Sequence, residues 1–238
     1  MRKIIIIGAT SGIGRELAML FASKGYKVGA TGRRKDMLLS LQKKYPDNIV
    51  IAPFDVTGKE NILSLQRLIE KLGGIDILMY NSGFGEVSKD LDWDIEKQTT
   101  DINVNGFVEI VCYAFNYFKN QGYGQIACTS SVASIRGNPH NPAYSASKAF
   151  ESIYMEGLFL KAYKLKADIT ITDIQPGFVD TGMAKGKGIF WMSKPSVAAL
   201  QIYHAIEAKK RKAYITRRWW IIAKLMKWMP MFIYKRIV

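Results

Sequence analysis

The chain has 238 residues, of which 48% are hydrophobic and 23% are charged. This length suits one large α/β domain better than two small ones, because a domain usually holds about 100–200 residues. The net charge of +14 is concentrated after Glu207, where ten basic residues and no acid follow, so the first 208 residues carry only +4 and nucleic-acid binding by the whole domain is not favoured.

Neither the cysteines nor the apolar runs point to secretion, metal binding or a membrane span. Cys112 and Cys128 have no metal-type spacing and are typical of a reduced, cytoplasmic setting. The first apolar run, residues 4–7, is too short for the core of a signal peptide. No stretch reaches the ~18 uninterrupted apolar residues of a membrane span. We therefore expect a cytoplasmic protein with no metal site, whose first apolar run is a buried strand.

Short β-branched runs alternate with longer helical patterns along the chain. Strands are predicted at residues 3–7, 27–31, 48–53, 75–80, 124–129, 168–174 and 213–216. Helices are predicted at residues 13–24, 35–45, 59–72, 95–119, 143–166 and 196–208. This alternation predicts a Rossmann-type doubly wound α/β fold, a parallel sheet of about seven strands with helices on both faces. Residues 1–216 would form the dinucleotide-binding catalytic domain and residues 217–238 a C-terminal extension.

A glycine-rich loop joins the first predicted strand to the first predicted helix. Such glycines let backbone N–H groups approach a pyrophosphate at a helix N-terminus, where the helix dipole favours an anion. A tight turn is the alternative, but the position between strand and helix favours a dinucleotide site. The loop residues expected to face the cofactor are Gly8, Thr10, Ser11, Gly12, Ile13 and Gly14.

The second predicted strand is followed by Arg33 and Arg34 rather than by an acid. Folds that select NAD tend to place an acid there to hold the ribose 2′-hydroxyl. Guanidinium groups instead pair well with phosphate oxygens. The sequence therefore predicts NADP(H) as the cofactor. The alternative is that the two arginines form the solvated start of a helix, and for Arg34 both can hold.

Tyr144 and Lys148 lie four residues apart at the start of a long predicted helix, on one helix face. A phenol, with a free pKa near 10, is a poor acid–base group at neutral pH, and a nearby ammonium favours its ionised form. This pairing suits a general acid that converts a ketone to an alcohol. Ser131 ends the preceding strand region, where its hydroxyl can bond the substrate oxygen. Taken singly, each could be an ordinary surface or turn residue.

In combination these motifs resemble the short-chain dehydrogenase/reductase family, in its soluble branch of ~250 residues. The resemblance covers residues 1 to about 208. It rests on the segments 8–14, 55–57, 81–83, 103–106, 130–131, 144–148 and 176–181. One departure concerns Tyr80, which stands where the family has the first asparagine of its N-N-A-G pattern, so the hydrogen bonding at the sheet centre is left open. Ser82 in place of alanine is a mild change.

The resemblance implies a role for each matched position. Tyr144 would be the acid–base residue, and Lys148 would hold the nicotinamide ribose and lower the pKa of Tyr144. Ser131 would orient the carbonyl, and Asn103 would maintain a water-linked proton path. Asp55 would reach the adenine ring. The further cofactor contacts implied are Arg33, Val56, Asn81, Gly83, Pro176, Gly177 and Thr181.

Residues 177–194 show no regular pattern and are expected to form a mobile loop. Phe190, Trp191 and Met192 in this loop favour an apolar substrate. The function expected is an NADP(H)-dependent oxidoreductase that interconverts a carbonyl and a secondary alcohol. The alternative is a non-catalytic NADP-binding interaction protein held at a membrane surface. The resemblance implies a homodimer or homotetramer.

Residues 217–238 combine six basic residues with three of the five tryptophans. On a helical projection the basic residues fall within about half of the circumference, although apolar residues share that half. Pro230 is expected to kink or end the helix. Such a composition is typical of interfacial helices, so attachment to an anionic membrane surface is the first hypothesis. The alternatives are a cap over a pocket for a long-chain substrate, an oligomer contact or packed helix and, least favoured, nucleic-acid binding.

Overall fold

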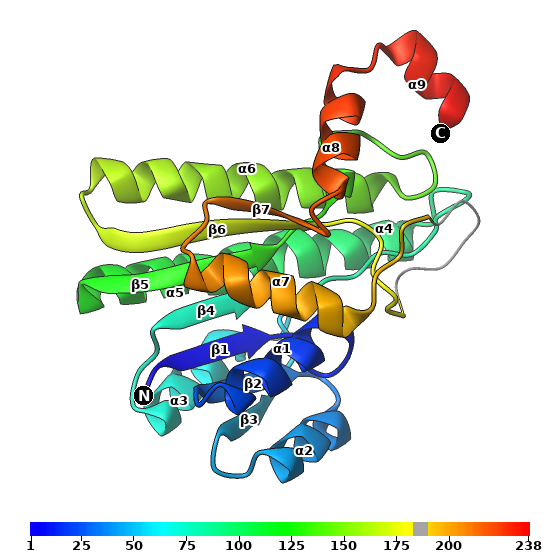
Figure 1. Cartoon of the computed structure of the whole chain (residues 1–238). Coiled ribbons are helices and arrows are strands. Elements are labelled where there is room, and N and C mark those ends of the chain that lie inside the picture. The colour runs from blue at the N-terminus through cyan, green and yellow to red at the C-terminus, as the bar shows by residue number, and fades with distance from the viewer. Residues whose placement is uncertain (183–189) are drawn as a thin grey trace.

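The computed structural model describes residues 1–182 and 190–238, and its centre is one sheet of seven parallel strands (Figure 1). The strands are β1 (Lys3–Ile7), β2 (Lys27–Gly32), β3 (Ile49–Pro53), β4 (Ile77–Tyr80), β5 (Tyr123–Thr129), β6 (Asp168–Pro176) and β7 (Lys212–Ile215). Their order across the sheet is β3-β2-β1-β4-β5-β6-β7. The predicted doubly wound parallel fold is confirmed.

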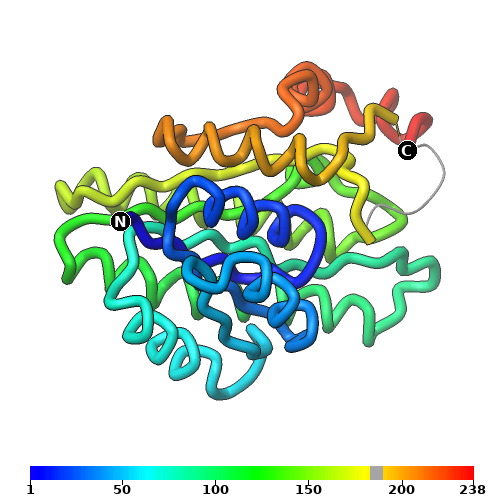
Figure 2. Tube along the Cα trace, turned by 60° about the horizontal axis from the view of Figure 1, so that its bottom comes forward, coloured from blue at the N-terminus to red at the C-terminus, as the bar shows by residue number. Residues whose placement is uncertain are grey.

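Helices cover both faces of this sheet because the strand residues are apolar on both sides. Ile4 and Ile6 of β1 pack into one core, and Ile5 and Ile7 pack into the other. The first core is covered by α1 (Gly12–Ser23), α2 (Lys35–Lys44) and α7 (Pro195–Glu207), and α1 and α7 lie side by side in Figure 2. The second is covered by α3 (Asn61–Leu72), α5 (Gly106–Gln121) and α6 (Pro142–Lys164).

The helix predicted over residues 95–119 is confirmed, but its hydrogen bonding changes in the middle. The structure has α4 (Trp93–Thr100), a stretch of π-helix (Asp101–Asn105), and then α5. A π-helix widens the turn, and such turns occur often at functional sites. The buried Tyr80 hydroxyl donates a hydrogen bond of 2.9 Å to the Ile102 carbonyl within this stretch. Tyr80 therefore makes its own link to the neighbouring helix, which the sequence had left open.

The strand order reverses beside β1, which lies between β2 and β4. At such a reversal the loops that leave neighbouring strands run to opposite faces, and a crevice opens beyond the strand ends. The glycine loop follows β1 and Asn81 follows β4, so both border this crevice. The short 3₁₀ helix Val132–Ile135 follows β5 at the same end of the sheet.

The C-terminal extension forms two helices, α8 (Trp219–Trp228) and α9 (Met231–Ile237), and Pro230 separates them as predicted. Figure 1 shows both at the end of the sheet where the strands terminate. Trp219 is only 4% exposed and, with Ala223, packs against Val132 of the 3₁₀ helix. One side of α8 is therefore part of a small core. Of the part of the chain that the structure describes, no helix is long and apolar enough to cross a membrane.

The loop predicted at residues 177–194 lies partly outside the described residues, since residues 183–189 are not described. Its two described ends are joined by an isolated bridge between Val179 and Ser193.

Candidate active site

The glycine loop is held against the exit of β4. Gly8 has a φ of +87°, and a Cβ placed on it would lie 2.7 Å from the Ser82 nitrogen. A Cβ on Gly14 would lie 2.1 Å from the Gly8 carbonyl oxygen. The Asn81 amide donates to that same oxygen at 3.1 Å and accepts from the Thr129 hydroxyl at 3.0 Å. The loop thus fits a ligand that needs close backbone approach.

The two arginines after β2 have different environments. Arg34 donates to the hydroxyls of Thr10 and Ser11 at 2.8 and 2.7 Å, and so it supports the glycine loop from outside. The Arg33 side chain is 60% exposed, and its nearest acid is Asp55 at 3.8 Å. Arg33 and Asp55 line one hollow of about 200 Å³ at this edge of the crevice. Arg33 therefore has a guanidinium available for a further anion.

The turn after β3 is fixed by its own polar groups. Asp55 accepts from the backbone N–H and the hydroxyl of Thr57 at 3.0 and 2.9 Å. The Val56 carbonyl accepts from the Asn61 amide at 2.7 Å. A Cβ on Gly106 would lie 2.9 Å from that carbonyl, so α5 begins directly beneath the turn. These contacts fix Val56 in the turn and hold Asp55 at the wall of the hollow.

The segment after β6 meets both halves of the crevice. A Cβ on Gly12 would lie 3.0 Å from the Thr181 methyl group, which brings Thr181 to the glycine loop. The Ser131 hydroxyl lies 3.5 Å from the Pro176 carbonyl oxygen and accepts from the Ala133 N–H at 3.0 Å. Gly177 is covered by Trp219, because a Cβ there would lie 2.0 Å from the indole ring. Ile13 packs against the core behind the loop.

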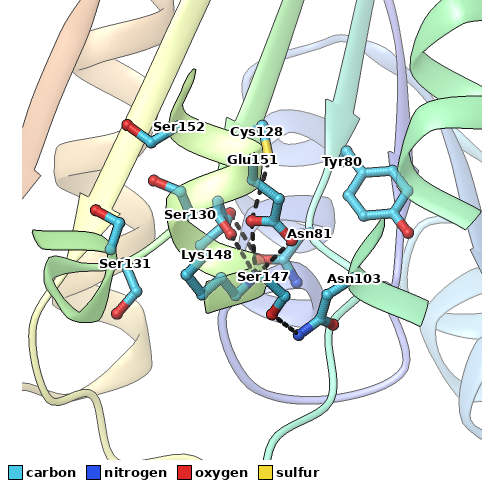
Figure 3. A network of polar contacts seen from close by, with 12 residues as sticks. Tyr80, Asn81, Asn103, Cys128, Ser130, Ser131, Ser147, Lys148, Glu151 and Ser152 are labelled. Carbon is cyan, nitrogen blue, oxygen red and sulfur yellow. Dashed lines mark hydrogen bonds and ion pairs between the residues drawn. The ribbon is translucent and has the colours of Figure 1, made fainter. Parts of the chain in front are cut away.

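Lys148 lies at the centre of a buried polar network (Figure 3). Its ammonium donates to the Thr129 carbonyl at 3.0 Å and to both carboxylate oxygens of Glu151 at 2.9 Å. A Cβ on Gly83 would lie 3.3 Å from the ammonium nitrogen, so Lys148 reaches the segment that follows β4. The same Cβ on Gly83 would lie 3.6 Å from the amide oxygen of Asn103.

Burial and pairing shift the pKa of both members of this ion pair. Burial raises the pKa of Glu151 to about 7, although the Lys148 charge acts to lower it. Burial acts to lower the pKa of Lys148, but the charges of Glu151, Tyr144 and Cys128 and the hydrogen bond to Glu151 together raise that pKa to about 12. Burial, together with the Glu151 charge, also raises the pKa of the Cys128 thiol.

Asn103 lies in the π-helix and joins the loop after β4 to α6. Its side chain is fully buried. Its amide nitrogen donates to the Phe84 carbonyl at 2.8 Å and to the Ser147 hydroxyl at 2.9 Å (Figure 3). Its oxygen accepts from the Phe84 N–H at 2.8 Å. These bonds occupy the Asn103 side chain, which fixes the loop beside Lys148.

The Tyr144 ring lies against Gly85 in the segment after β4. A Cβ on Gly85 would lie 2.3 Å from the Tyr144 ring, so the ring packs directly on the backbone. The Lys148 ammonium is 5.9 Å from the centroid of that ring. The structure therefore brings the residues matched by the catalytic motifs to one end of the sheet, with Tyr144 and Lys148 from α6 and Ser131 after β5.

We expect the substitution Gly85→Ala to destabilise the protein by about 1–3 kcal/mol, because the new methyl group would overlap the Tyr144 ring and displace it. Thermal unfolding measures the loss. Gly157→Ala on α6 is the matched control, since nothing lies within 4 Å of the added atom, and it should not lower the stability. A Gly85→Ala variant as stable as the wild type would contradict the placement of the ring.

Two residues near the site carried no signal in the sequence. Glu151 stands three residues after Lys148, a spacing that allows contact on a helix, but nothing in the spacing shows that the pair is buried. Trp219 was predicted only as part of an amphipathic extension. The structure instead places its ring over Gly177, which the resemblance had implied to be a cofactor contact.

Comparison with known proteins points to one family. The family model described as short chain dehydrogenase matches residues 2–189. An uncharacterized oxidoreductase of Mycobacterium tuberculosis is 30% identical over 238 residues, covering 96% of this chain and 92% of the relative. Another uncharacterized oxidoreductase, from Myxococcus xanthus, is 33% identical over 184 residues and covers 75% of this chain and 72% of its own.

Two solved structures share the fold. A 3-ketoacyl-(acyl-carrier-protein) reductase from Brucella melitensis, complexed with NADH, has a TM-score of 0.81 and 20% identity, and the match covers 91% of this chain and 98% of that one. An actinorhodin polyketide ketoreductase with NADPH has a TM-score of 0.80 and 21% identity, covering 90% and 94%. Structures of this fold therefore include complexes with either nicotinamide dinucleotide.

Proposed function

The chain belongs to the short-chain dehydrogenase family and is an oxidoreductase of that family, and from this premise we propose that it interconverts a carbonyl and a secondary alcohol with NADP(H). The observation that supports the proposal is that Tyr144 and Lys148 from one helix and Ser131 from the neighbouring strand end lie at the same end of the sheet. The glycine loop stands between β1 and the N-terminus of α1, and a pyrophosphate is the anion that such a helix N-terminus would receive.

Each reacting side chain has one task in this mechanism. When bound, the nicotinamide dinucleotide supplies or accepts the hydride. In carbonyl reduction the Ser131 hydroxyl donates a hydrogen bond to the carbonyl oxygen and orients it. Tyr144 donates its phenolic proton to the oxygen as negative charge develops there. Lys148 stabilises the phenolate that remains. In alcohol oxidation Tyr144 takes the proton back.

The proposed preference for NADP(H) rests on Arg33. Its guanidinium is exposed beside the hollow at the crevice edge, and the acid that faces it lies at 3.8 Å, beyond hydrogen-bond distance. A ribose 2′-phosphate is the anion that this position would receive. The second hypothesis, a non-catalytic NADP-binding protein, includes the same contact. The two hypotheses differ in whether the wild type turns over a ketone and whether Tyr144→Phe abolishes that turnover.

An aromatic cluster supports an apolar substrate. Phe178 lies 5.4 Å and Phe190 lies 5.1 Å from the Trp219 ring centroid, and Trp191 lies 6.3 Å from it. The cluster joins the described ends of the loop after β6 to α8. Next to the 3₁₀ helix is a hollow of about 340 Å³ that includes Ile135 and Ala149. We therefore propose a carbonyl substrate with an apolar body.

We also propose that the outer surface of α8 and α9, here called the tail surface, attaches to an anionic membrane. Its exposed apolar side chains are Trp220, Ile221, Leu225, Trp228, Met231, Phe232, Ile233 and Ile237. Its basic side chains are Arg217, Arg218, Lys224, Lys227, Lys235 and Arg236. Apolar side chains gathered this densely are unusual on a monomer, and their mixture with cations suits lipid headgroups.

Charge complementarity favours a membrane over a second copy of the chain. No acid follows Glu207, so two tail surfaces face to face would bring like charges together. An anionic bilayer instead attracts each basic residue by ~1 kcal/mol. The predicted homodimer or homotetramer, for which other surfaces remain, stays a prediction.

We expect the protein to sediment with vesicles of phosphatidylcholine and phosphatidylserine, and not with phosphatidylcholine alone. Lys224→Glu, Lys227→Glu and Lys235→Glu together should weaken binding at least tenfold, because three attractive charges become repulsive. Lys119→Glu, Lys161→Glu and Lys164→Glu form the matched control, with the same net charge change at exposed positions near the ends of α5 and α6.

Substitution is a cleaner test here than truncation, because removing the tail would also uncover Gly177. Equal sedimentation of the two triple variants would contradict membrane attachment. A dimer in light scattering that only the tail variant loses would show instead that the tail surface is an oligomer contact.

A further inference from the structure

Glu151 is a buried acid in direct contact with the catalytic lysine. It lies one turn after Lys148 on α6, and its side chain has 0% exposure against 5% for Lys148. The Lys148 ammonium has three N–H donors, and its three acceptors are the two carboxylate oxygens of Glu151 and the Thr129 carbonyl. All three donors of the Lys148 ammonium are therefore paired with protein groups.

The groups that face Glu151 come from three strands besides its own helix. The Cys128 thiol on β5 donates to it at 3.7 Å. Asp173 on β6 and Tyr80 on β4 interact with it through charge. The nearby cation Lys212 is instead paired with Asp173 at 3.3 Å. Among the contacts that the described residues make, Lys148 is thus the cation that Glu151 neutralises.

Stability alone does not explain a carboxylate at this position. Removing an acid from water is costly, and a buried ion pair is often no more stabilising than apolar residues of similar volume. The buried residues that follow Glu151 on this helix face are apolar, with Met155 and Leu158 in the same core. We therefore look for a role of this acid in the function of the site, beyond the stability of the fold.

We propose that Glu151 is a positioning residue for Lys148, which it orients toward the crevice and whose positive charge it offsets at Tyr144. The inference rests on the proposed function, in which Lys148 favours the phenolate form of Tyr144. A carboxylate next to the ammonium weakens that effect, because the pair has no net charge.

The test measures the phenolate of Tyr144 directly. Absorbance near 295 nm is followed from pH 6 to 11, with and without saturating NADP⁺, in the wild type and in Glu151→Gln. The same titration in each Tyr144→Phe background is subtracted, which isolates one of the twelve tyrosines. Removing the carboxylate charge should move the midpoint of the Tyr144 titration down by about one pH unit. In the oxidation of 2-octanol the pH profile of kcat/KM should move by the same amount.

Glu156→Gln is the matched control, because it makes the same change on the same helix at a side chain that is 59% exposed and pairs with Arg211 at 3.6 Å. It should leave the midpoint unchanged. A folded Glu151→Gln whose midpoint stays at the wild-type value, or rises, would overturn the inference.

Where Glu151→Gln fails to fold, Glu151→Asp takes its place. It keeps the charge but withdraws it from the ammonium, so the midpoint should fall by a smaller amount, and an unchanged midpoint would overturn the inference. The titration needs no substrate. If the wild type proved inert toward ketones and alcohols, the proposed function would fail while the effect of Glu151 on Tyr144 remained measurable.

Discussion

The substitution Tyr144→Phe is expected to lower kcat/KM for the reduction of 2-octanone by about 1000-fold, within the usual range for loss of a general acid. Only the hydroxyl is removed, and the ring can keep its contact with Gly85 and its place beside Lys148. NADPH binding, measured by fluorescence titration, should therefore change less than about threefold. A large loss of turnover with cofactor binding retained is the signature of a group that acts on the reacting bond.

Tyr154→Phe is the matched control for this experiment. Tyr154 is on the same helix, and its ring packs against Phe107 and Phe150 outside the crevice. Its substitution should leave kcat/KM unchanged. Activity retained by Tyr144→Phe would contradict the assignment of the acid. A wild type that binds NADPH but reduces no ketone across a broad panel would favour the non-catalytic hypothesis.

The substitution Arg33→Ala is expected to raise the KM for NADPH about 30-fold and to leave the KM for NADH within about twofold. A hydrogen bond to a charged group contributes about 1.5–3 kcal/mol, which corresponds to a factor of roughly 10 to 150. The effect should be confined to the cofactor with a 2′-phosphate, because Arg33 makes no hydrogen bond to the glycine loop in the described structure. Initial rates with each cofactor at saturating 2-octanone measure the difference.

Arg34→Ala separates phosphate recognition from support of the loop. Arg34 holds the hydroxyls of Thr10 and Ser11, so its loss should weaken NADPH and NADH alike. If Arg33→Ala weakened both cofactors equally, the proposed contact with the 2′-phosphate would be wrong. If Arg34→Ala alone changed the preference, the recognition would belong to Arg34.

The features that the sequence predicted well are those encoded within a few residues. The glycine loop lies between one strand and one helix as predicted, and Gly8 and Gly14 pack so closely on neighbouring protein atoms that neither position has room for a side chain. Tyr144 and Lys148 are four residues apart on one helix, so their shared face follows from helix geometry. Alternating strands and helices were enough to predict the doubly wound sheet, since such a chain has few other ways to bury both faces.

Other features depended on segments far apart in the chain. The predicted helix over residues 95–119 contains a π-helical stretch that its sequence did not indicate, and in that stretch Asn103 and the Ile102 carbonyl bond partners outside the helix. The amphipathic pattern of residues 217–238 predicted a helix with a basic side and an apolar side. The structure adds a contact that the pattern did not show, because Trp219 packs on Gly177, a residue 42 positions earlier.

The sequence by itself thus determined the sheet, and it also supplied the glycine loop and the side chains that we propose for the reaction. Only the tertiary structure decided that Glu151 is buried against Lys148 and that α8 closes over the segment after β6. The physical reason is that burial and charge pairing depend on what the other elements bring to the same place. Spacing along one helix can show that two side chains are able to meet. It cannot show whether the pair is buried or exposed to water.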